Sequence, residues 1–236
     1  MPTYTLNLRA FAGAALLAMA CSPAGSTPRA DASPGPVKTE TAQKPAVDVN
    51  DPLLAAADHG RIRGDSAAKT WVVIASDFQC PYCKQWHDET YSAFMNEYVR
   101  SGKVKVAYVN FPLAQHQFAL ITAQAAMCAS AQNKFWEYHD ALFNSQPQWE
   151  AMTQPRPLLD SIAKTVGVDV AAWGKCVDSQ KMLPIIMADR DRLSNAGVQS
   201  TPSFLIGDQM LVGAQPIDAM RLALDSAVKK NSGSAR

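Results

Sequence analysis

The feature that most constrains this chain is a pair of cysteines, Cys80 and Cys83, placed where a strand-like segment gives way to a helix-like one. Residues 71–74 form a short apolar run that is mostly β-branched, and residues 84–100 carry apolar residues at helical spacing. The pair is therefore predicted to begin a helix, where free backbone N–H groups and the helix dipole stabilise a thiolate. We predict that Cys80 is the attacking thiol and that Cys83 resolves the mixed disulfide.

The two residues between the cysteines, Pro81 and Tyr82, fit this placement. Proline has a fixed φ that suits the first helical turn, and the amides of Tyr82 and Cys83 remain free to point at the Cys80 sulfur. Two thiolates at this spacing also occur in zinc or copper sites, and His87 could supply a third ligand. A structural zinc site needs a second close pair, however, and the other cysteines stand alone. We therefore predict no metal here.

Residues 1–20 are predicted to be a secretory signal, because residues 10–20 form an uncharged and largely apolar run. No later segment reaches the about 20 apolar residues that a membrane-crossing helix needs. Residues 17–21 resemble a bacterial lipoprotein cleavage box, although Ala18 stands where leucine is more usual. We expect lipidation at Cys21; the alternative is ordinary cleavage that leaves this cysteine unmodified.

Composition then divides the rest of the chain. Residues 21–50 are rich in Pro, Ser, Thr, Ala and Gly without a periodic apolar face, which predicts a flexible tether. Residues 51–236, about 185 residues, suffice for one domain with a substantial core. The chain has 22 basic and 21 acidic residues and no basic cluster, so nucleic-acid binding is not expected.

The chain has five cysteines, and removing Cys21 leaves four, which allow three disulfide connectivities. An even number is what an oxidising compartment requires. If Cys80 and Cys83 form the active pair, Cys128 and Cys176 are left for each other. The alternative is that these two are separate buried thiols.

The order of elements predicts an α/β fold. A strand over residues 103–109 follows the first helix, and residues 203–206 and 210–212 flank a Gly-Asp turn as a hairpin before a helix over residues 217–230. The intervening helix-like segments are residues 118–131, 134–144, 157–166, 168–178 and 182–196. We therefore expect a helical insertion, about residues 114–196, between an N-terminal βαβ-like part and the C-terminal hairpin and helix.

Four motifs together resemble the thioredoxin superfamily, and within it the DsbA-like branch with a large helical insertion. They are residues 76–83, residues 110–113 with His116, residues 132–140 and residues 197–204. The resemblance covers residues 67–228. It implies a thioredoxin fold in which Pro202 is cis beside Cys80, with Cys80 exposed and Cys83 buried. It also implies that the Thr201 backbone pairs with a bound peptide. In some members a second disulfide ties the insertion together, as pairing of Cys128 with Cys176 would.

The resemblance implies a thiol-disulfide oxidoreductase of the cell envelope that forms disulfides in secreted proteins without a cofactor. Its expected partners are reduced or unfolded secreted proteins and a membrane thiol-redox partner. We expect a periplasmic-side location, with the membrane contacted only through a lipid anchor. Pro81-Tyr82 does not fix the direction of exchange, so a reductase or isomerase is an alternative. Alternatives of another class are a metal carrier using Cys80, Cys83 and His87, and a holdase chaperone binding clients near Thr201.

One position departs from the family pattern. Many relatives carry a buried acid six residues before the first cysteine, and this chain has Ile74 there. Asp77 could substitute only if its side chain turned inward, and we expect it to face water at the strand end. His116 and His139 are expected to pack in helix-like segments, and His87 is expected on a solvated helix face.

Overall fold

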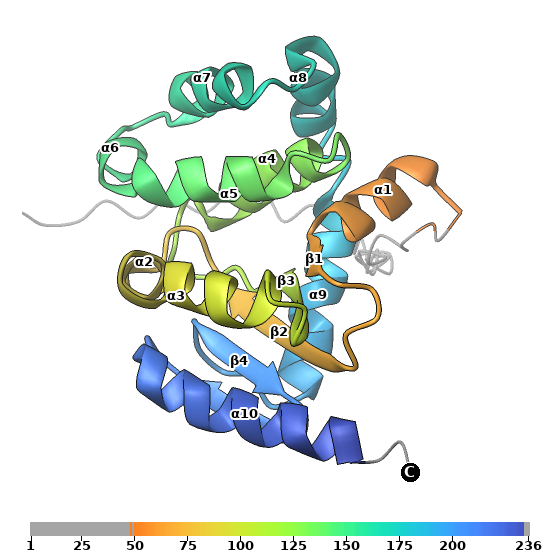
Figure 1. Cartoon of the computed structure of the whole chain (residues 1–236). Coiled ribbons are helices and arrows are strands. Elements are labelled where there is room, and N and C mark those ends of the chain that lie inside the picture. The colour runs from red at the N-terminus through yellow and green to blue at the C-terminus, as the bar shows by residue number, and fades with distance from the viewer. Residues whose placement is uncertain (1–47, 49, 234–236) are drawn as a thin grey trace, which may run out of the picture. The chain divides into compact units, whose positions relative to one another are not determined.

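The computed structural model describes residue 48 and residues 50–233. The predicted signal segment 1–20, Cys21 and most of the predicted tether 21–50 lie outside the described residues. The elements run in this order: α1 (Pro52–Gly60), β1 (Ile62–Gly64), β2 (Thr70–Ser76), α2 (Pro81–Trp86), η1 (His87–Tyr91), α3 (Ser92–Phe94), η2 (Met95–Val99), β3 (Val104–Asn110), α4 (Ala119–Ser130), α5 (Phe135–Asn144), α6 (Gln146–Glu150), α7 (Arg156–Val166), α8 (Val170–Asp178), α9 (Leu183–Asn195), β4 (Ser203–Ile206), β5 (Gln209–Val212) and α10 (Ile217–Gly233) (Figure 1).

A five-stranded sheet with the order β1-β3-β2-β4-β5 forms the centre of the domain. Strand β2 pairs in parallel with β3 and antiparallel with β4, so that Ile74 lies between Tyr108 and Phe204. Strands β4 and β5 form the predicted hairpin, with Ile206 opposite Gln209 and a two-residue turn between them. The α/β class and the insertion predicted from the sequence are confirmed.

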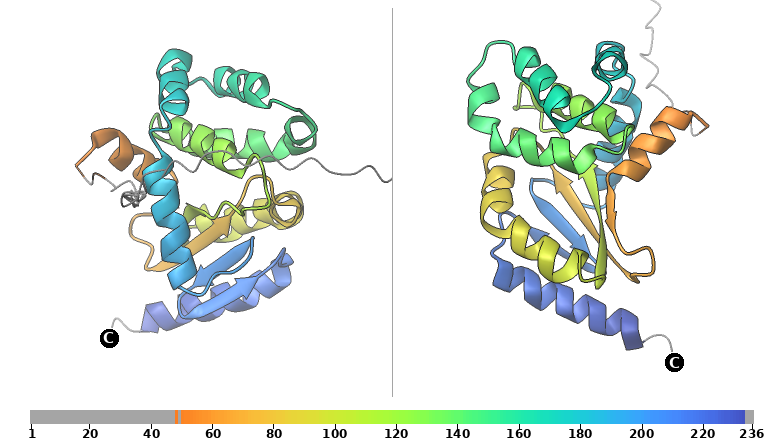
Figure 2. Two further views of the ribbon diagram at one scale, coloured as in Figure 1. Left: turned by 180° about the vertical axis from the view of Figure 1, so that it is seen from behind. Right: turned by 45° about the horizontal axis from the view of Figure 1, so that its top comes forward.

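The two faces of the sheet carry different helices, which Figure 2 shows from behind and from above. Along β2, Val72 and Ile74 belong to the large apolar core that includes residues of α2, α3 and α10. Ala75 belongs instead to a small cluster with Leu193 of α9. Because successive side chains of a strand point to opposite faces, a strand covered on both sides is apolar throughout. This explains the continuous apolar run that marked β2 in the sequence.

The helix that follows β2 runs from Pro81 to Val99 as α2, η1, α3 and η2, with helical backbone angles at each junction. Two of its turns have the wider π-type hydrogen bonding, which the sequence does not reveal. Its buried face packs on the sheet, with the Trp86 ring 4.7 Å from that of Phe204. The start of this helix is thereby held against β4.

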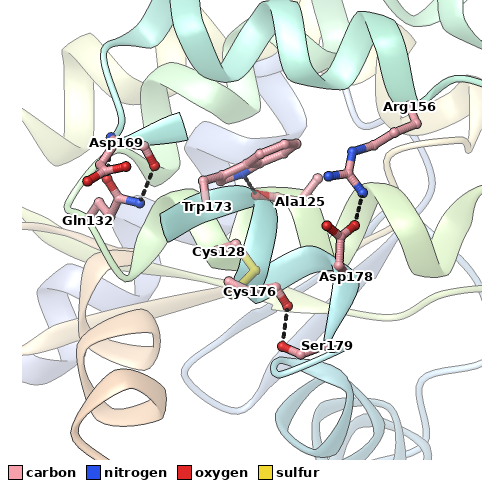
Figure 3. The surroundings of a disulfide bond; sticks show 9 residues. All are labelled: Ala125, Cys128, Gln132, Arg156, Asp169, Trp173, Cys176, Asp178 and Ser179. Carbon is pink, nitrogen blue, oxygen red and sulfur yellow. Dashed lines mark hydrogen bonds and ion pairs between the residues drawn. A yellow bond between two sulfur atoms is a disulfide. The ribbon is translucent and has the colours of Figure 1, made fainter. Parts of the chain in front are cut away.

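The insertion is built around α4, whose residues are almost all buried. A helix that is apolar all round belongs in an interior, and α4 contacts α1, α5, α8 and α9. Figure 3 shows the disulfide between Cys128 of α4 and Cys176 of α8, with a Cα–Cα distance of 5.9 Å. Beside it, the Trp173 indole N–H donates to the Ala125 carbonyl at 2.9 Å. The pairing of these two cysteines is the one that the family resemblance implies.

Three short elements, α1, β1 and α6, were not predicted. Helix α1 has nine residues, and its N-cap Asp51 accepts the Leu53 amide at 2.9 Å. Strand β1 has three residues and is a strand only through its antiparallel pairing with β3. Strand β1 and α6 are too short to show a period. Helix α1 was overlooked, although Asp51 and Pro52 form a helix-start signal.

Candidate active site

Cys80 lies at the N-cap of α2 in extended backbone, with Pro81 at the first helical position. Its amide donates to the Asp77 carbonyl at 3.1 Å, and its carbonyl accepts the Lys84 amide at 3.1 Å. These bonds join the end of β2 to the first helical turn. The structure therefore places both cysteines at the strand-to-helix transition that the sequence predicts.

Thr201 and Pro202 lie beside this helix start, just before the strand that pairs with β2. The Thr201–Pro202 peptide is cis and immediately precedes β4, which pairs with β2 so that Ser203 lies opposite Ala75. The Cys80 thiol donates to the Thr201 carbonyl at 3.3 Å, across 121 positions of sequence. The Thr201 hydroxyl oxygen is buried and has no hydrogen-bond partner among the residues that the structure describes. This hydroxyl is thus free to donate to a Cys80 thiolate.

The pKa of the Cys80 thiol is lowered, whereas the pKa of the Cys83 thiol is raised. Hydrogen bonding from the Cys83 thiol is the largest influence that lowers the pKa of Cys80 to about 6, with help from the Thr201 hydroxyl and the Cys83 and Tyr82 amides against the cost of burial. Burial, followed by the neighbouring Cys80 sulfur, raises the pKa of Cys83 well above its ordinary value. At neutral pH the pair is therefore a Cys80 thiolate beside a protonated Cys83.

The expectation of an exposed Cys80 is wrong for this structure, because Cys80 is only 3% exposed and Cys83 is 1% exposed. The sulfur of Cys80 lies against the Thr201 carbonyl, and Gln146 of α6 donates to the Phe78 carbonyl at 2.6 Å and the Cys80 carbonyl at 3.3 Å. Tyr82, by contrast, is 61% exposed. Gln146 was missed in the sequence, because α6 itself gave no signal.

Asp77 is buried, so the expectation that it faces water is wrong. It accepts the Gln79 amide at 2.8 Å and the Leu113 amide at 2.9 Å, and it lies 2.7 Å from His116 Nδ1. The segment between β3 and α4 supplies Leu113 and His116, and the loop before Cys80 supplies Gln79, which explains why a carboxylate is stable there. His116 lies in that segment and not in a helix. The Asp77 carboxylate thus fixes the loop before Cys80 to the segment after β3.

The expectation that His87 lies on a solvated helix face is also wrong, because its side chain is only 10% exposed. Its ring lies 5.1 Å from Tyr91 and 5.0 Å from Phe143, so it points toward α5. Among the described residues it does not join the two thiols in a metal-ligating group. The three-ligand set of the metal-carrier alternative is therefore not assembled.

His139 packs as expected in a buried aromatic cluster, and burial lowers its pKa. Ile74 is buried in the core. An apolar side chain therefore fills the position where the family pattern described above has an acid.

The dithiol lies at a strand-to-helix transition, and a cis proline immediately precedes the neighbouring strand. This combination defines a thioredoxin-type exchange site. A family model described as Thioredoxin matches residues 56–226. The probable disulfide bond formation protein D of Bacillus anthracis is 29% identical over 171 residues, which cover 71% of this chain and 77% of that protein. The chain therefore belongs to the thioredoxin superfamily, as a thiol-disulfide oxidoreductase of the DsbA-like branch.

Solved structures agree with this fold. Oxidised BdbD from Bacillus subtilis superposes with a TM-score of 0.66 at 22% identity, over 72% of this chain and 94% of that one. The alpha-DsbA1 protein of Wolbachia pipientis gives a TM-score of 0.66 at 21% identity, over 75% of this chain and 94% of that one. Within the described part of this chain, no helix is long and apolar enough to cross a membrane.

Proposed function

We propose that this protein donates its Cys80–Cys83 disulfide to reduced proteins. The observation that carries this proposal is the low pKa of Cys80, about 6, set chiefly by the Cys83 thiol. A thiol of low pKa is a good leaving group, so a mixed disulfide at Cys80 resolves toward an oxidised client. The names of the Bacillus relatives, which refer to disulfide bond formation, support the same direction.

Exchange proceeds in two displacements. A client thiolate attacks the Cys80 sulfur of the oxidised pair, the Cys80–Cys83 bond breaks, and Cys83 leaves and takes up a proton because its pKa is raised. A second client thiolate then attacks the client sulfur of the mixed disulfide and releases Cys80 as a thiolate. Two electrons pass from the client to the dithiol, and the client gains one disulfide.

The surroundings of the dithiol assign supporting roles. Pro81 and Tyr82 hold the first helical turn, and the Thr201 backbone before cis Pro202 pairs with the client segment that carries the attacking cysteine. In the reduced protein the Cys80 sulfur lies 3.3 Å from the Thr201 carbonyl and is 3% exposed, so a client segment must displace this contact to reach it. The Cys128–Cys176 disulfide is structural and takes no part in exchange.

The cellular setting is part of the proposal. Residues 1–20 direct export, Cys21 carries a lipid, residues 21–50 tether the domain, and residues 51–236 form that domain on the periplasmic side of the envelope. Its clients are reduced or unfolded secreted proteins, and a membrane thiol-redox partner restores the disulfide. Residues 17–21 and the resemblance to DsbA-like proteins support this setting.

The reduction potential of the Cys80–Cys83 pair in glutathione buffers tests the direction of exchange. We expect a value near that of DsbA, about −120 mV, and oxidation of a reduced, unfolded client protein. A value near that of thioredoxin, about −270 mV, would overturn the donor assignment in favour of a reductase or isomerase. Cys80→Ser must abolish exchange. A protein that shows no exchange and prevents aggregation of unfolded clients equally well with and without this change would be a holdase chaperone instead.

A further inference from the structure

A second cluster of ligating side chains lies apart from the two thiols. It consists of His87 of η1 with His139 and Asp140 of α5, and one ligand atom from each lies within 4.8 Å of the others. His139 Nδ1 is 2.8 Å and His87 Nε2 is 3.5 Å from the same Asp140 oxygen. Residues 52 positions apart in sequence thus converge where α5 passes over the helix that begins at Cys80 (Figure 1).

These distances suit a small metal ion. Zinc lies about 2.0 to 2.1 Å from imidazole nitrogen and carboxylate oxygen, which separates neighbouring ligand atoms of a tetrahedral site by about 3.3 Å. Two histidines and one carboxylate with an open fourth position are a ligand set that zinc uses. The two separations from Asp140, 2.8 and 3.5 Å, bracket that value, and all three ligand atoms lie within 4.8 Å of one another.

The surroundings of His87 supply the orienting partner that a ligating histidine needs. Its other ring nitrogen, Nδ1, is 3.3 Å from an Asp88 carboxylate oxygen. A carboxylate at that nitrogen holds its proton and leaves Nε2 unprotonated and available to a metal. The aromatic contacts with Tyr91 and Phe143 hold the ring in the same orientation.

An open position lies beside the cluster. A cavity of about 240 Å³ is lined by both His87 and Asp140, together with Tyr91 and Arg100. Tyr91 is 7% exposed, and its buried hydroxyl has no hydrogen-bond partner among the described residues. This hydroxyl can bond a metal-bound water, and the Arg100 charge favours water or an anion as the fourth ligand.

We propose that His87, His139 and Asp140 bind one divalent transition-metal ion of the zinc class, with the fourth position open to the adjacent cavity. The site is separate from the dithiol and uses neither cysteine. The ion links the helix that carries Cys80 and Cys83 to α5 of the insertion. It thereby stabilises the packing of the insertion on the thioredoxin core, as any ligand of the folded state does.

Calorimetric titration of the oxidised full-length protein with zinc chloride, after removal of metals by a chelator, tests this site. Oxidation removes the Cys80 and Cys83 thiolates as competing ligands. We expect one equivalent bound, with affinity reduced at least about 100-fold in His87→Ala and in Asp140→Asn, since even outer-shell losses cost 10- to 100-fold. His59→Ala is the matched control, because His59 is exposed on α1 and should leave binding unchanged.

Cobalt substitution provides the second readout. We expect visible absorption of tetrahedral Co²⁺ without thiolate-to-cobalt charge transfer. Circular dichroism and thiol exchange should match wild type in both variants, which shows that they fold. The proposal is overturned if the oxidised protein binds no zinc, or if binding persists in both variants. Binding confined to the reduced protein and lost in Cys80→Ser would overturn it in favour of a site at the dithiol.

Discussion

Arg61 and Asp189 form an ion pair that is buried on both sides, with side-chain exposures of 4% and 0%. Arg61 Nη2 lies 3.0 Å from Asp189 Oδ1, and a second contact joins Nη1 to Oδ2. Asp189 also accepts the side-chain amide of Asn110 at 3.2 Å. Three segments therefore meet at one carboxylate, namely the residue before β1, the end of β3 and the middle of α9.

Replacing Arg61 with methionine should lower the free energy of unfolding by up to about 3–5 kcal/mol, because Asp189 would lose its buried cation. Among the cations of the described residues it would keep only Arg192, whose side chain is 64% exposed. Urea denaturation measures this loss. The double variant Arg61→Met with Asp189→Leu removes both charges and should recover part of the stability. A single variant as stable as wild type would show that the pair does not determine the packing of α9.

The acidity of Cys80 predicts the pH dependence of its alkylation. Because the thiolate is the reacting form, the rate of modification by iodoacetamide in the reduced protein should rise with pH to a midpoint near 6. Cys83 should remain unmodified over that range, since burial raises its pKa. Mass spectrometry of the alkylated peptide measures both rates. A Cys80 midpoint near 9 would contradict the hydrogen bonding described above.

The same acidity affects stability. The Cys80 pKa of about 6 in the folded reduced protein lies below the ordinary value of 9.0. Its contribution to stability is therefore fully present above about pH 9 and is lost as pH falls through 6. Reduced protein should gain stability relative to oxidised protein between pH 6 and 9. Denaturation of both forms at several pH values measures this difference, and a constant difference would refute the prediction.

Thr201→Val tests the role of the buried hydroxyl. Valine keeps the shape and removes the donor, so the Cys80 pKa should rise and the reduction potential should become more negative. The matched control is Thr122→Val on α4, whose hydroxyl donates to the Phe118 carbonyl and not to a sulfur. An alkylation midpoint unchanged in Thr201→Val would assign the low pKa to Cys83 and the backbone amides alone.

Removing the disulfide in the double variant Cys128→Ser, Cys176→Ser should lower the free energy of unfolding by about 4 kcal/mol. The bridge spans a sequence separation of 48, and closing such a loop restricts the unfolded chain. Thiol exchange at Cys80 should persist in the folded variant at low temperature. Chemical denaturation with a parallel exchange assay measures both quantities, and loss of exchange in folded protein would contradict a structural role.

The sequence predicts the parts of this fold that depend on local periodicity and spacing. Strands β2 and β3, the hairpin and the helices α4, α5 and α7 to α9 lie where apolar patterns indicate them. The orientations of Asp77 and His87 were not predictable, because each is set by a partner far along the chain. Burial of Cys80 was likewise not predictable, because it depends on contact with Thr201, which lies 121 positions later in the sequence.

The position of β4 has a consequence for biosynthesis. Strand β2 is central in the sheet, yet its neighbour β4 begins at Ser203, after the whole insertion. A ribosome makes the chain from its N-terminus, so Cys80, Cys83, Cys128 and Cys176 all appear before Thr201 does. During that interval the Thr201 carbonyl that contacts the Cys80 sulfur is absent. The contacts between α4 and α8 that hold Cys128 beside Cys176 involve no residue of β4, so they can form before β4 is made.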